Sequence, residues 1–193
     1  MRNNAAAGSD LFLAGGPHVL VERVRIHCSG TLVEDLYPYS RQHEIFAQKL
    51  MPMTHNVNQA ISNNIMTYEE QAENNWNLEP KTIAGGYYAT MSFPIACGFL
   101  KSGKMLPIRY SNIMIEITFA SAADALVTNN EQTLAPYDPA TASTNYTITE
   151  LSVHCAQARL DSSLEQSFAQ LLLSNRALTP PIRTIATQVQ TLP

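Results

Sequence analysis

The chain has little charge, and its positive charge is not concentrated anywhere. Only 15% of its 193 residues are charged, with 12 Lys and Arg against 16 Asp and Glu, which gives a net charge of −4. Lys and Arg form no arm or stripe along the sequence. Non-specific binding to nucleic acid needs many phosphate contacts, each made by a cation. We therefore expect no direct contact with DNA or RNA.

Three other features are also scarce. No apolar run approaches the ~20 residues that a membrane-spanning helix needs. The first ten residues lack an apolar segment long enough for export, so we expect no signal peptide. The three cysteines, Cys28, Cys97 and Cys155, are an odd number at wide spacing. This spacing favours reduced, buried thiols over a disulfide framework.

What the chain does have is alternation of apolar and polar residues. It is clearest at residues 111–120, where Ile113, Ile115, Ile117 and Phe119 occupy every second position. Successive side chains of a strand point to opposite faces, so this pattern predicts a strand with one buried face. Weaker versions predict further strands at 19–28, 31–37, 87–95, 146–156 and 182–190.

The best hairpin signal joins the first two of these segments. Ser29-Gly30 lies between them and predicts a tight turn. In the first segment, the alternation divides the residues between two faces. One face is expected to carry Leu20, Val24, Ile26 and Cys28, and the other Val21, Arg23, Arg25 and His27.

Helices and loops are fewer and less regular. Ser40 is expected to cap a helix that runs to about residue 50, with Ile45 on its apolar side. Asp161 or Ser162 is expected to cap a second helix, because apolar residues follow at helical spacing. Residues 1–17 predict a loop or tail, and 53–82 and 121–144 predict long polar loops.

Together these elements predict a mainly β fold in one domain. A hydrophobic fraction of 45% over this length is enough for a core. Strands joined by long excursions, without alternating strands and helices, are typical of two stacked antiparallel sheets. We therefore expect residues 1–193 to form an antiparallel β-sandwich of jelly-roll type with one or two short helices.

The sequence offers weak candidates for a metal site. His27-Cys28 and His154-Cys155 supply the residue types that bind zinc. Neighbours on a strand point to opposite faces, however, so one strand cannot offer both to a single ion. The favoured interpretation is small buried cysteines with histidines on the outer face, and no metal.

The acidic pairs and the phosphate-loop candidate are equally weak. Glu34-Asp35 and Glu69-Glu70 are adjacent in sequence, whereas the two carboxylates of a glycosidase converge from separate elements. We expect both pairs to be solvated. The segment from Lys101 to Lys104 is too short for a phosphate-binding loop.

The remaining polar candidates do not form a catalytic motif. His43-Glu44 lacks the second histidine of a zinc protease and predicts a surface helix. His18 and His55 lie in expected loops without an identifiable partner, and Ser29 is a turn serine rather than a nucleophile. We predict no catalytic, cofactor-binding or metal-binding residues, no cofactor and no enzymatic activity.

Aromatic residues leave a ligand-binding alternative open. Aromatic side chains can stack on sugars or anchor the core and the loops, and the core and anchor roles are more common. The alternative function is a jelly-roll carbohydrate-binding module that uses Trp76 and the pair Tyr87-Tyr88. A cupin-like metalloenzyme ranks last, because the five histidines are scattered. The aromatic residues considered are Tyr37, Tyr39, Tyr68, Trp76, Tyr87 and Tyr88.

Four passages together resemble a known family. They are residues 21–36, Met91-Ser-Phe-Pro-Ile95, Met105-Leu-Pro-Ile-Arg-Tyr110 and residues 146–178, which include Leu160-Asp-Ser-Ser-Leu164. Their arrangement resembles the first jelly roll of major capsid proteins of the double jelly-roll lineage, found in double-stranded DNA viruses and related mobile elements. A complete double jelly roll is much longer than this chain. The resemblance therefore implies one roll, either by itself or as part of a longer double jelly-roll chain.

The resemblance also implies a function. Proteins of this lineage are structural components of the virion, and they self-assemble as homotrimers that tile an icosahedral shell beside neighbouring capsid proteins. We therefore expect a capsid protein whose long polar loops contact other subunits. Contact with the genome would be left to other proteins or to an internal membrane beneath the shell.

Overall fold

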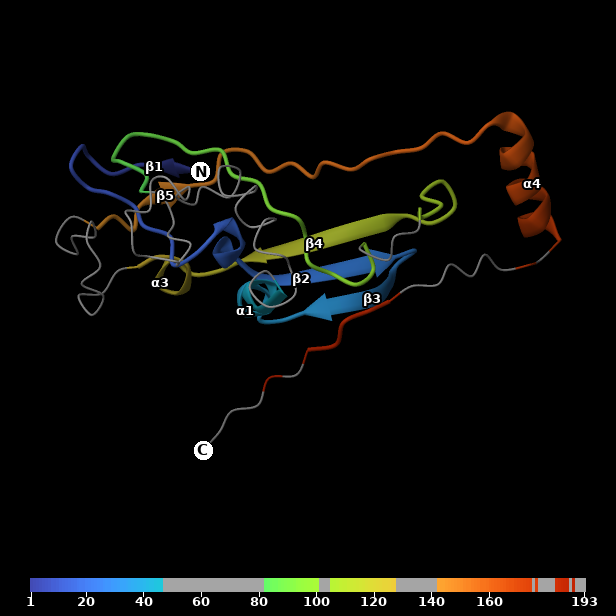
Figure 1. Cartoon of the computed structure of the whole chain (residues 1–193), viewed down its shortest axis with the longest axis horizontal. Coiled ribbons are helices and arrows are strands. Elements are labelled where there is room, and N and C mark those ends of the chain that lie inside the picture. The colour runs from blue at the N-terminus through green and yellow to red at the C-terminus, as the bar shows by residue number, and fades with distance from the viewer. Residues whose placement is uncertain are drawn as a thin grey trace, which may run out of the picture.

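The described part of the chain is mainly β, with antiparallel sheets and a few short helices (Figure 1). The computed structural model describes residues 1–46, 82–100, 105–127, 142–174, 176, 183–187 and 189. The prediction of a mainly β, antiparallel fold is confirmed. In chain order the elements are β1 Arg2–Asn3, the 3-10 helix η1 Pro17–Leu20, β2 Val21–Cys28, β3 Thr31–Leu36, α1 Tyr39–Ile45, β4 Ile113–Phe119, α3 Ala122–Ala125, β5 Tyr146–Thr147 and α4 Ser162–Leu173.

A three-stranded antiparallel sheet of order β3-β2-β4 forms the centre of the structure. The hairpin between β2 and β3 turns at Ser29 and Gly30, whose φ angles are 49° and 82°. Positive φ at both central residues is typical of the tight turns whose twist matches paired strands. Both strands of the predicted hairpin are therefore confirmed, and β4 confirms the strand predicted within 111–120.

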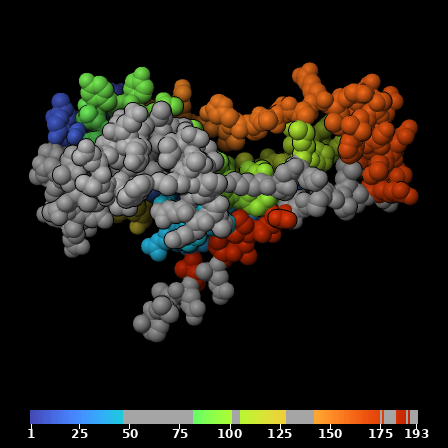
Figure 2. All heavy atoms as spheres, in the orientation of Figure 1, coloured from blue at the N-terminus to red at the C-terminus, as the bar shows by residue number. Residues whose placement is uncertain are grey.

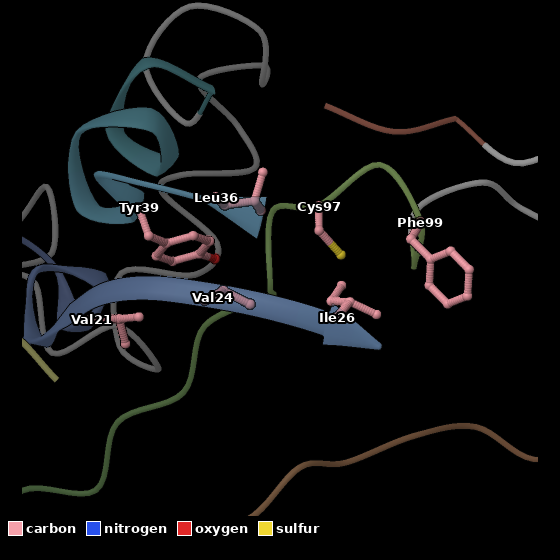
Figure 3. Close-up of a cluster of buried hydrophobic side chains, with 7 residues drawn as sticks. All are labelled: Val21, Val24, Ile26, Leu36, Tyr39, Cys97 and Phe99. Carbon is pink, nitrogen blue, oxygen red and sulfur yellow. The ribbon is translucent and has the colours of Figure 1, made fainter. Parts of the chain in front are cut away.

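The main core lies on one face of this sheet (Figure 3). Alternate residues of β2 and β3 point into it, and α1 and the segment around Cys97 and Phe99 cover them. Ile113, Ile115 and Ile117 of β4 pack against the cluster and are partly buried. Each fully buried side chain of this size contributes about 1.5–3 kcal/mol. The buried members are Val21, Val24, Ile26, Leu36, Tyr39, Cys97 and Phe99.

A second core includes the N-terminal segment, so residues 1–17 are not a tail, although most of them form no helix or strand, as predicted for a loop. β1 pairs with β5, and Leu11 and Leu13 are 0% and 1% exposed. Isolated bridges join Leu11 to Ile83 and Leu13 to Leu126. In the sequence this segment is only the short apolar run Leu11-Phe12-Leu13-Ala14, which is too short to predict a strand.

The helices partly match their predictions. α1 begins at Tyr39 after Pro38 rather than after Ser40, and Ile45 is 61% exposed whereas Tyr39 is buried. α4 begins as expected, because the Asp161 carboxylate accepts a hydrogen bond from the Ser163 amide. None of the helices that the structure describes is long and apolar enough to span a lipid bilayer.

Three predicted strands are wrong or shorter than expected. Residues 87–95 form no strand; a single isolated β-bridge joins Tyr88 to Arg2. Within 146–156 only Tyr146–Thr147 belongs to a strand. The described residues of the last segment, 183–187 and 189, form no strand. Most of the two predicted long loops, 53–82 and 121–144, lies outside the described residues, and α3 occupies part of the second.

Candidate functional site

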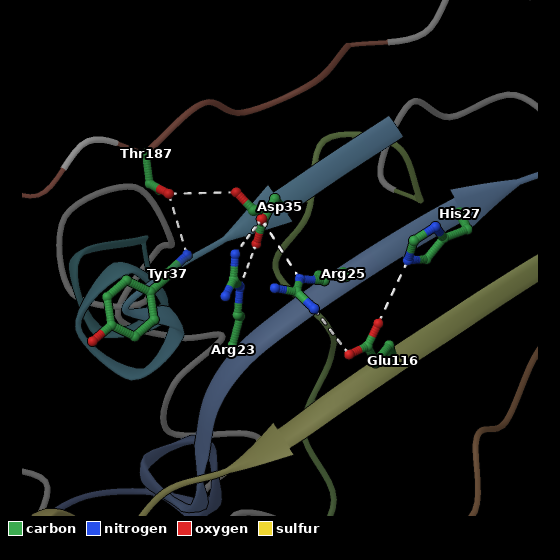
Figure 4. A network of polar contacts seen from close by, with 7 residues as sticks. All are labelled: Arg23, Arg25, His27, Asp35, Tyr37, Glu116 and Thr187. Carbon is green, nitrogen blue, oxygen red and sulfur yellow. Dashed lines mark hydrogen bonds and ion pairs between the residues drawn. The ribbon is translucent and has the colours of Figure 1, made fainter. Parts of the chain in front are cut away.

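Charged side chains line the face of the sheet opposite the main core (Figure 4). Arg25 of β2 lies between Asp35 of β3 and Glu116 of β4, each directly opposite it in register. Its Nη1 is 3.1 Å from Glu116 Oε1, and its Nε is 3.6 Å from Asp35 Oδ2. His27 Nε2 is 3.5 Å from Glu116 Oε2. The face thus alternates positive and negative residues across the strands.

Arg23 and Asp35 form the best-aligned pair on this face. Arg23 Nε and Nη2 donate to Asp35 Oδ1 and Oδ2 at 2.8 and 2.6 Å. The hydrogen bonds from Arg23 lower the pKa of Asp35 below its ordinary value. Because Asp35 and Glu116 neutralise the arginines, this face offers no concentrated positive charge to an anionic ligand.

The predicted outward face of β2 is confirmed for Arg23, Arg25 and His27, but not for Val21. Val21 is 4% exposed and belongs to the main core. The register between β2 and β4 shifts between Val21 and Arg23. A bulge of this kind breaks the strict alternation of faces, which explains the exception.

Glu34 is buried, so the prediction of a solvated Glu34-Asp35 pair is wrong for this residue. Glu34 lies opposite Ile26 on the core face and is 2% exposed. Its Oε1 accepts from the amides of Gly98 and Ile185 at 2.8 and 2.9 Å, and its Oε2 accepts from the Phe99 amide at 2.9 Å. Hydrogen bonds of this kind offset the free-energy cost of removing a carboxylate from water. The sequence held part of this signal, because Glu34 is two residues from Leu36, which points into the same core.

The Glu34 carboxylate joins two segments that are far apart in sequence. A Cβ on Gly98 would lie 2.5 Å from the Arg183 carbonyl oxygen, so the two backbones approach closely only because this residue is glycine. Thr187 Oγ1 accepts from the Tyr37 amide at 3.2 Å and lies 3.4 Å from the Asp35 carbonyl oxygen (Figure 4). Residues 183–187 therefore run along β3 although they form no ladder with it.

Two histidines form a buried cluster, which contradicts both of their predictions. His18 of η1 and His43 of α1 are 5% and 4% exposed, and their rings stack with centroids 4.3 Å apart. His18 Nε2 is 2.6 Å from Glu44 Oε2, and His43 Nε2 is 3.2 Å from the Pro94 carbonyl oxygen. His43 is therefore not on a surface, and His18 is not in a loop without a partner. No local pattern in the sequence joins these residues.

The expected metal candidates do not converge. Cys28 Sγ is 2.8 Å from Ser111 Oγ, while His154 and Cys155 are exposed. All three cysteines are free, but only Cys97 is fully buried, so the prediction of buried thiols is wrong for Cys155. Among the residues that the structure describes, no group of three His, Cys, Asp or Glu residues is arranged to hold a metal ion.

The aromatic residues divide between core and surface. Tyr39 is fully buried, and its hydroxyl accepts from the Ala96 amide at 2.9 Å. Burial raises the pKa of Tyr39. Tyr87 and Tyr88 are 70% and 79% exposed. Several sequence candidates lie outside the described residues, namely His55, Tyr68, Glu69, Glu70, Trp76, Lys101 and Lys104.

Among the described residues, an extended and mostly exposed segment is formed by residues 148–160, which we call the arm. Every residue from 151 to 160 is exposed, including Leu151 at 63% and Val153 at 51%. The arm leads to α4, in which no residue is buried. Figure 2 shows both in orange, with the arm along the upper edge of the molecule and α4 at its right end, next to yellow-green atoms. The sequence predicted a helix here with apolar residues at helical spacing; the structure has the helix, but none of its residues is buried.

No protein-family model, curated protein or solved structure matches this chain.

Proposed function

We propose that this chain is a structural protein that self-assembles into a viral capsid and has no catalytic site. The observation that carries the proposal is the exposed arm with α4. Both elements have an apolar face, and neither face is covered by the described part of the chain. Isolated helices shorter than ~12–15 residues are marginal in water, so α4 needs a packing partner. A protein that assembles with other copies would supply one.

The proposed fold is an antiparallel β-sandwich of jelly-roll type, in which the three-stranded sheet forms part of one layer. The resemblance of residues 21–36, 91–95, 105–110 and 146–178 to the first roll of double jelly-roll capsid proteins supports this assignment. On this proposal residues 1–193 are one roll, by itself or within a longer double jelly-roll chain. The expected assembly is a homotrimer beside neighbouring capsid proteins in the virion.

The surface charge is compatible with a shell protein that does not bind the genome. The arginines of the outer sheet face are neutralised by Asp35 and Glu116. Because nucleic-acid affinity depends on unneutralised cations, contact with the genome would be left to other proteins or to an internal membrane.

Light scattering and negative-stain electron microscopy of the purified chain test this function. We expect trimers or larger closed assemblies whose abundance rises with protein concentration. A chain that stays monomeric at high concentration, with α4 intact by circular dichroism, would refute self-assembly.

A carbohydrate-binding module is the second candidate, and one observation favours it. Tyr87 and Tyr88 are adjacent and strongly exposed, directly after the turn at Gly86. Exposed aromatic rings of this kind stack on sugars. A glycan array with the chain and its Tyr87→Ala/Tyr88→Ala variant tests it, with Tyr110→Ala as control because Tyr110 is also exposed. The absence of any saturable hit removes this candidate.

A further inference from the structure

One edge of β4 is unpaired. The strand pairs with β2 on one side, and its other side makes no backbone hydrogen bond within the described residues. It contains no proline and a single charged residue, Glu116. Natural proteins usually cover such an edge or protect it with charge or proline, because a long apolar edge is a template for another strand. We therefore looked for the segment that could cover it.

The arm begins and ends beside the two ends of this same strand. At its start, Tyr146 packs against the second core together with Ala120, which directly follows β4. Beyond its end, Glu165 of α4 forms an ion pair with Arg109, which lies shortly before β4. The arm therefore runs antiparallel to β4, from the end of that strand back toward its start (Figure 1).

The arm is also extended, unpaired and long enough. Residues 148–160 make no backbone hydrogen bond to any described residue. The chain advances 15 positions from Tyr146 to Asp161, whereas 11 positions separate Arg109 from Ala120. At about 3.3 Å per residue, an extended arm can follow the whole of β4 with a few residues to spare.

The apolar faces of the two segments can be joined. The arm carries Leu151, Val153 and Cys155 at alternate positions. On β4, alternate isoleucines point toward the main core and are only partly buried. Joining these faces requires that odd-numbered residues of the arm lie opposite odd-numbered residues of β4, because strand side chains have a period of two. The isoleucines are Ile113, Ile115 and Ile117.

The fixed ends limit how far the arm can slide along β4. One limit places Tyr146 opposite Ala120, and the other places Asp161 opposite Arg109. Between these limits, three registers that differ by two residues join the apolar faces, and each of them covers the free edge. The residue of the arm that lies opposite Thr118 is then Ile148, Glu150 or Ser152.

We propose that the arm is a strap that closes on the free edge of its own β4 as an added antiparallel strand, which gives the sheet order β3-β2-β4-arm. The described arrangement is the open form. The chain's own arm is the occupant because both of its ends are fixed beside this edge, and its direction and length match the edge. The closure takes place within one chain, so it goes beyond the proposed self-assembly and does not depend on it. The closed arm extends a partly buried apolar face that other copies can still cover.

Disulfide scanning tests the closure and determines its register. In a Cys155→Ala background, Thr118→Cys is combined in one chain with Ile148→Cys, Glu150→Cys or Ser152→Cys under mild oxidation. The matched control combines Thr118→Cys with Leu151→Cys, whose side chain would lie on the opposite face. Directly opposed strand residues suit a disulfide, so one of the three pairs should link within the monomer at least about tenfold faster than the control. Cleavage at Glu131, which lies between the two cysteines, identifies the link by mass spectrometry.

Hydrogen exchange measures the closure without cross-linking. Alternate amides of the arm should exchange at least about tenfold more slowly than in an unfolded chain, and dilution should not change this protection, because the pairing is intramolecular. Neighbouring amides of a strand point to opposite sides, so one of Ser152→Pro and Val153→Pro removes a donor to β4 and should abolish the protection. Ala158→Pro lies beyond the paired residues in all three registers and should leave the protection unchanged.

Three results would overturn the inference. Arm amides that exchange as in an unfolded chain would show that the arm does not close. Protection that falls on dilution, or disulfides that join two chains, would show that a second copy occupies the edge. A control pair that links as fast as the best of the three pairs would show that the arm has no fixed face. Self-assembly is scored separately by light scattering, so the closure and the proposed function can each fail without the other.

Discussion

Replacing Glu34 with alanine should be among the most destabilising single substitutions in this chain. The change removes the acceptor for the amides of Gly98, Phe99 and Ile185. The Phe99 bond is buried, whereas the other two are partly buried. A buried donor left without an acceptor costs about 1–3 kcal/mol, and donors that water reaches cost less.

The expected loss of unfolding free energy is about 3–5 kcal/mol, from one full penalty and two reduced ones. This is a large share of the roughly 5–15 kcal/mol that stabilises a typical domain. Glu34→Gln should cost less, because one oxygen remains as an acceptor. The new side-chain NH2 group, however, would replace an oxygen that accepts a hydrogen bond, and it would place one donor against another.

Urea unfolding measures the effect, and hydrogen exchange at the Ile185 amide reports local release. Asp35→Asn is the matched control, because Asp35 is the next residue on β3 and its ion pairs lie on the solvated face, where they contribute about 0–1 kcal/mol. If Glu34→Ala and Asp35→Asn have equal effects, or if Ile185 exchange is unchanged, the buried carboxylate does not hold residues 183–187.

Three further substitutions test smaller parts of the structure. Gly98→Ala should lower the unfolding free energy by about 1–3 kcal/mol, because the new Cβ meets a backbone carbonyl at 2.5 Å; a neutral change by urea unfolding would contradict this close approach. Hydrogen bonds from Arg23 lower the pKa of Asp35, so its stabilisation is complete above the unfolded pKa and is lost as the pH falls through the lower folded value. Asp35→Asn should therefore flatten the acid limb of the stability curve: its small cost, about 0–1 kcal/mol, should appear near neutral pH and vanish at low pH. Asp161→Ala removes the acceptor for the Ser163 amide and should reduce α4 content by circular dichroism, with Asp161→Asn retaining it.

Local patterns predicted the parts of this fold that depend on neighbouring residues. The alternation in Ile113–Phe119 and the Ser29-Gly30 turn were enough to predict β2, β3 and β4. The Asp161 cap was predicted because its hydrogen bond spans only two residues. Capping and turn geometry are set within a few positions, so sequence alone carries them.

Contacts between distant segments were not predictable in the same way. His18 and His43 stack because η1 and α1 pack together, and neither residue lies in a pattern that indicates the other. The burial of Leu11 depends on a bridge to Ile83, which is far away along the chain. Such pairings are decided by tertiary packing, which overrides local preference. The buried Glu34 falls between these cases, since its face was predictable and its partners were not.

The arm poses the opposite problem, because its sequence is that of a buried strand and its side chains are exposed. Leu151 and Val153 alternate with polar residues, and this alternation has a physical benefit only when one face is covered. Apolar surface removed from water contributes about 25 cal/mol per Å², so the uncovered arm and α4 forgo that stabilisation. Among the described residues, β4 pairs only with β2, and its other edge has no partner strand. Packing against other copies would cover the apolar residues of the arm and of α4, and this is why the proposed self-assembly accounts for a strand-like sequence whose side chains lie exposed.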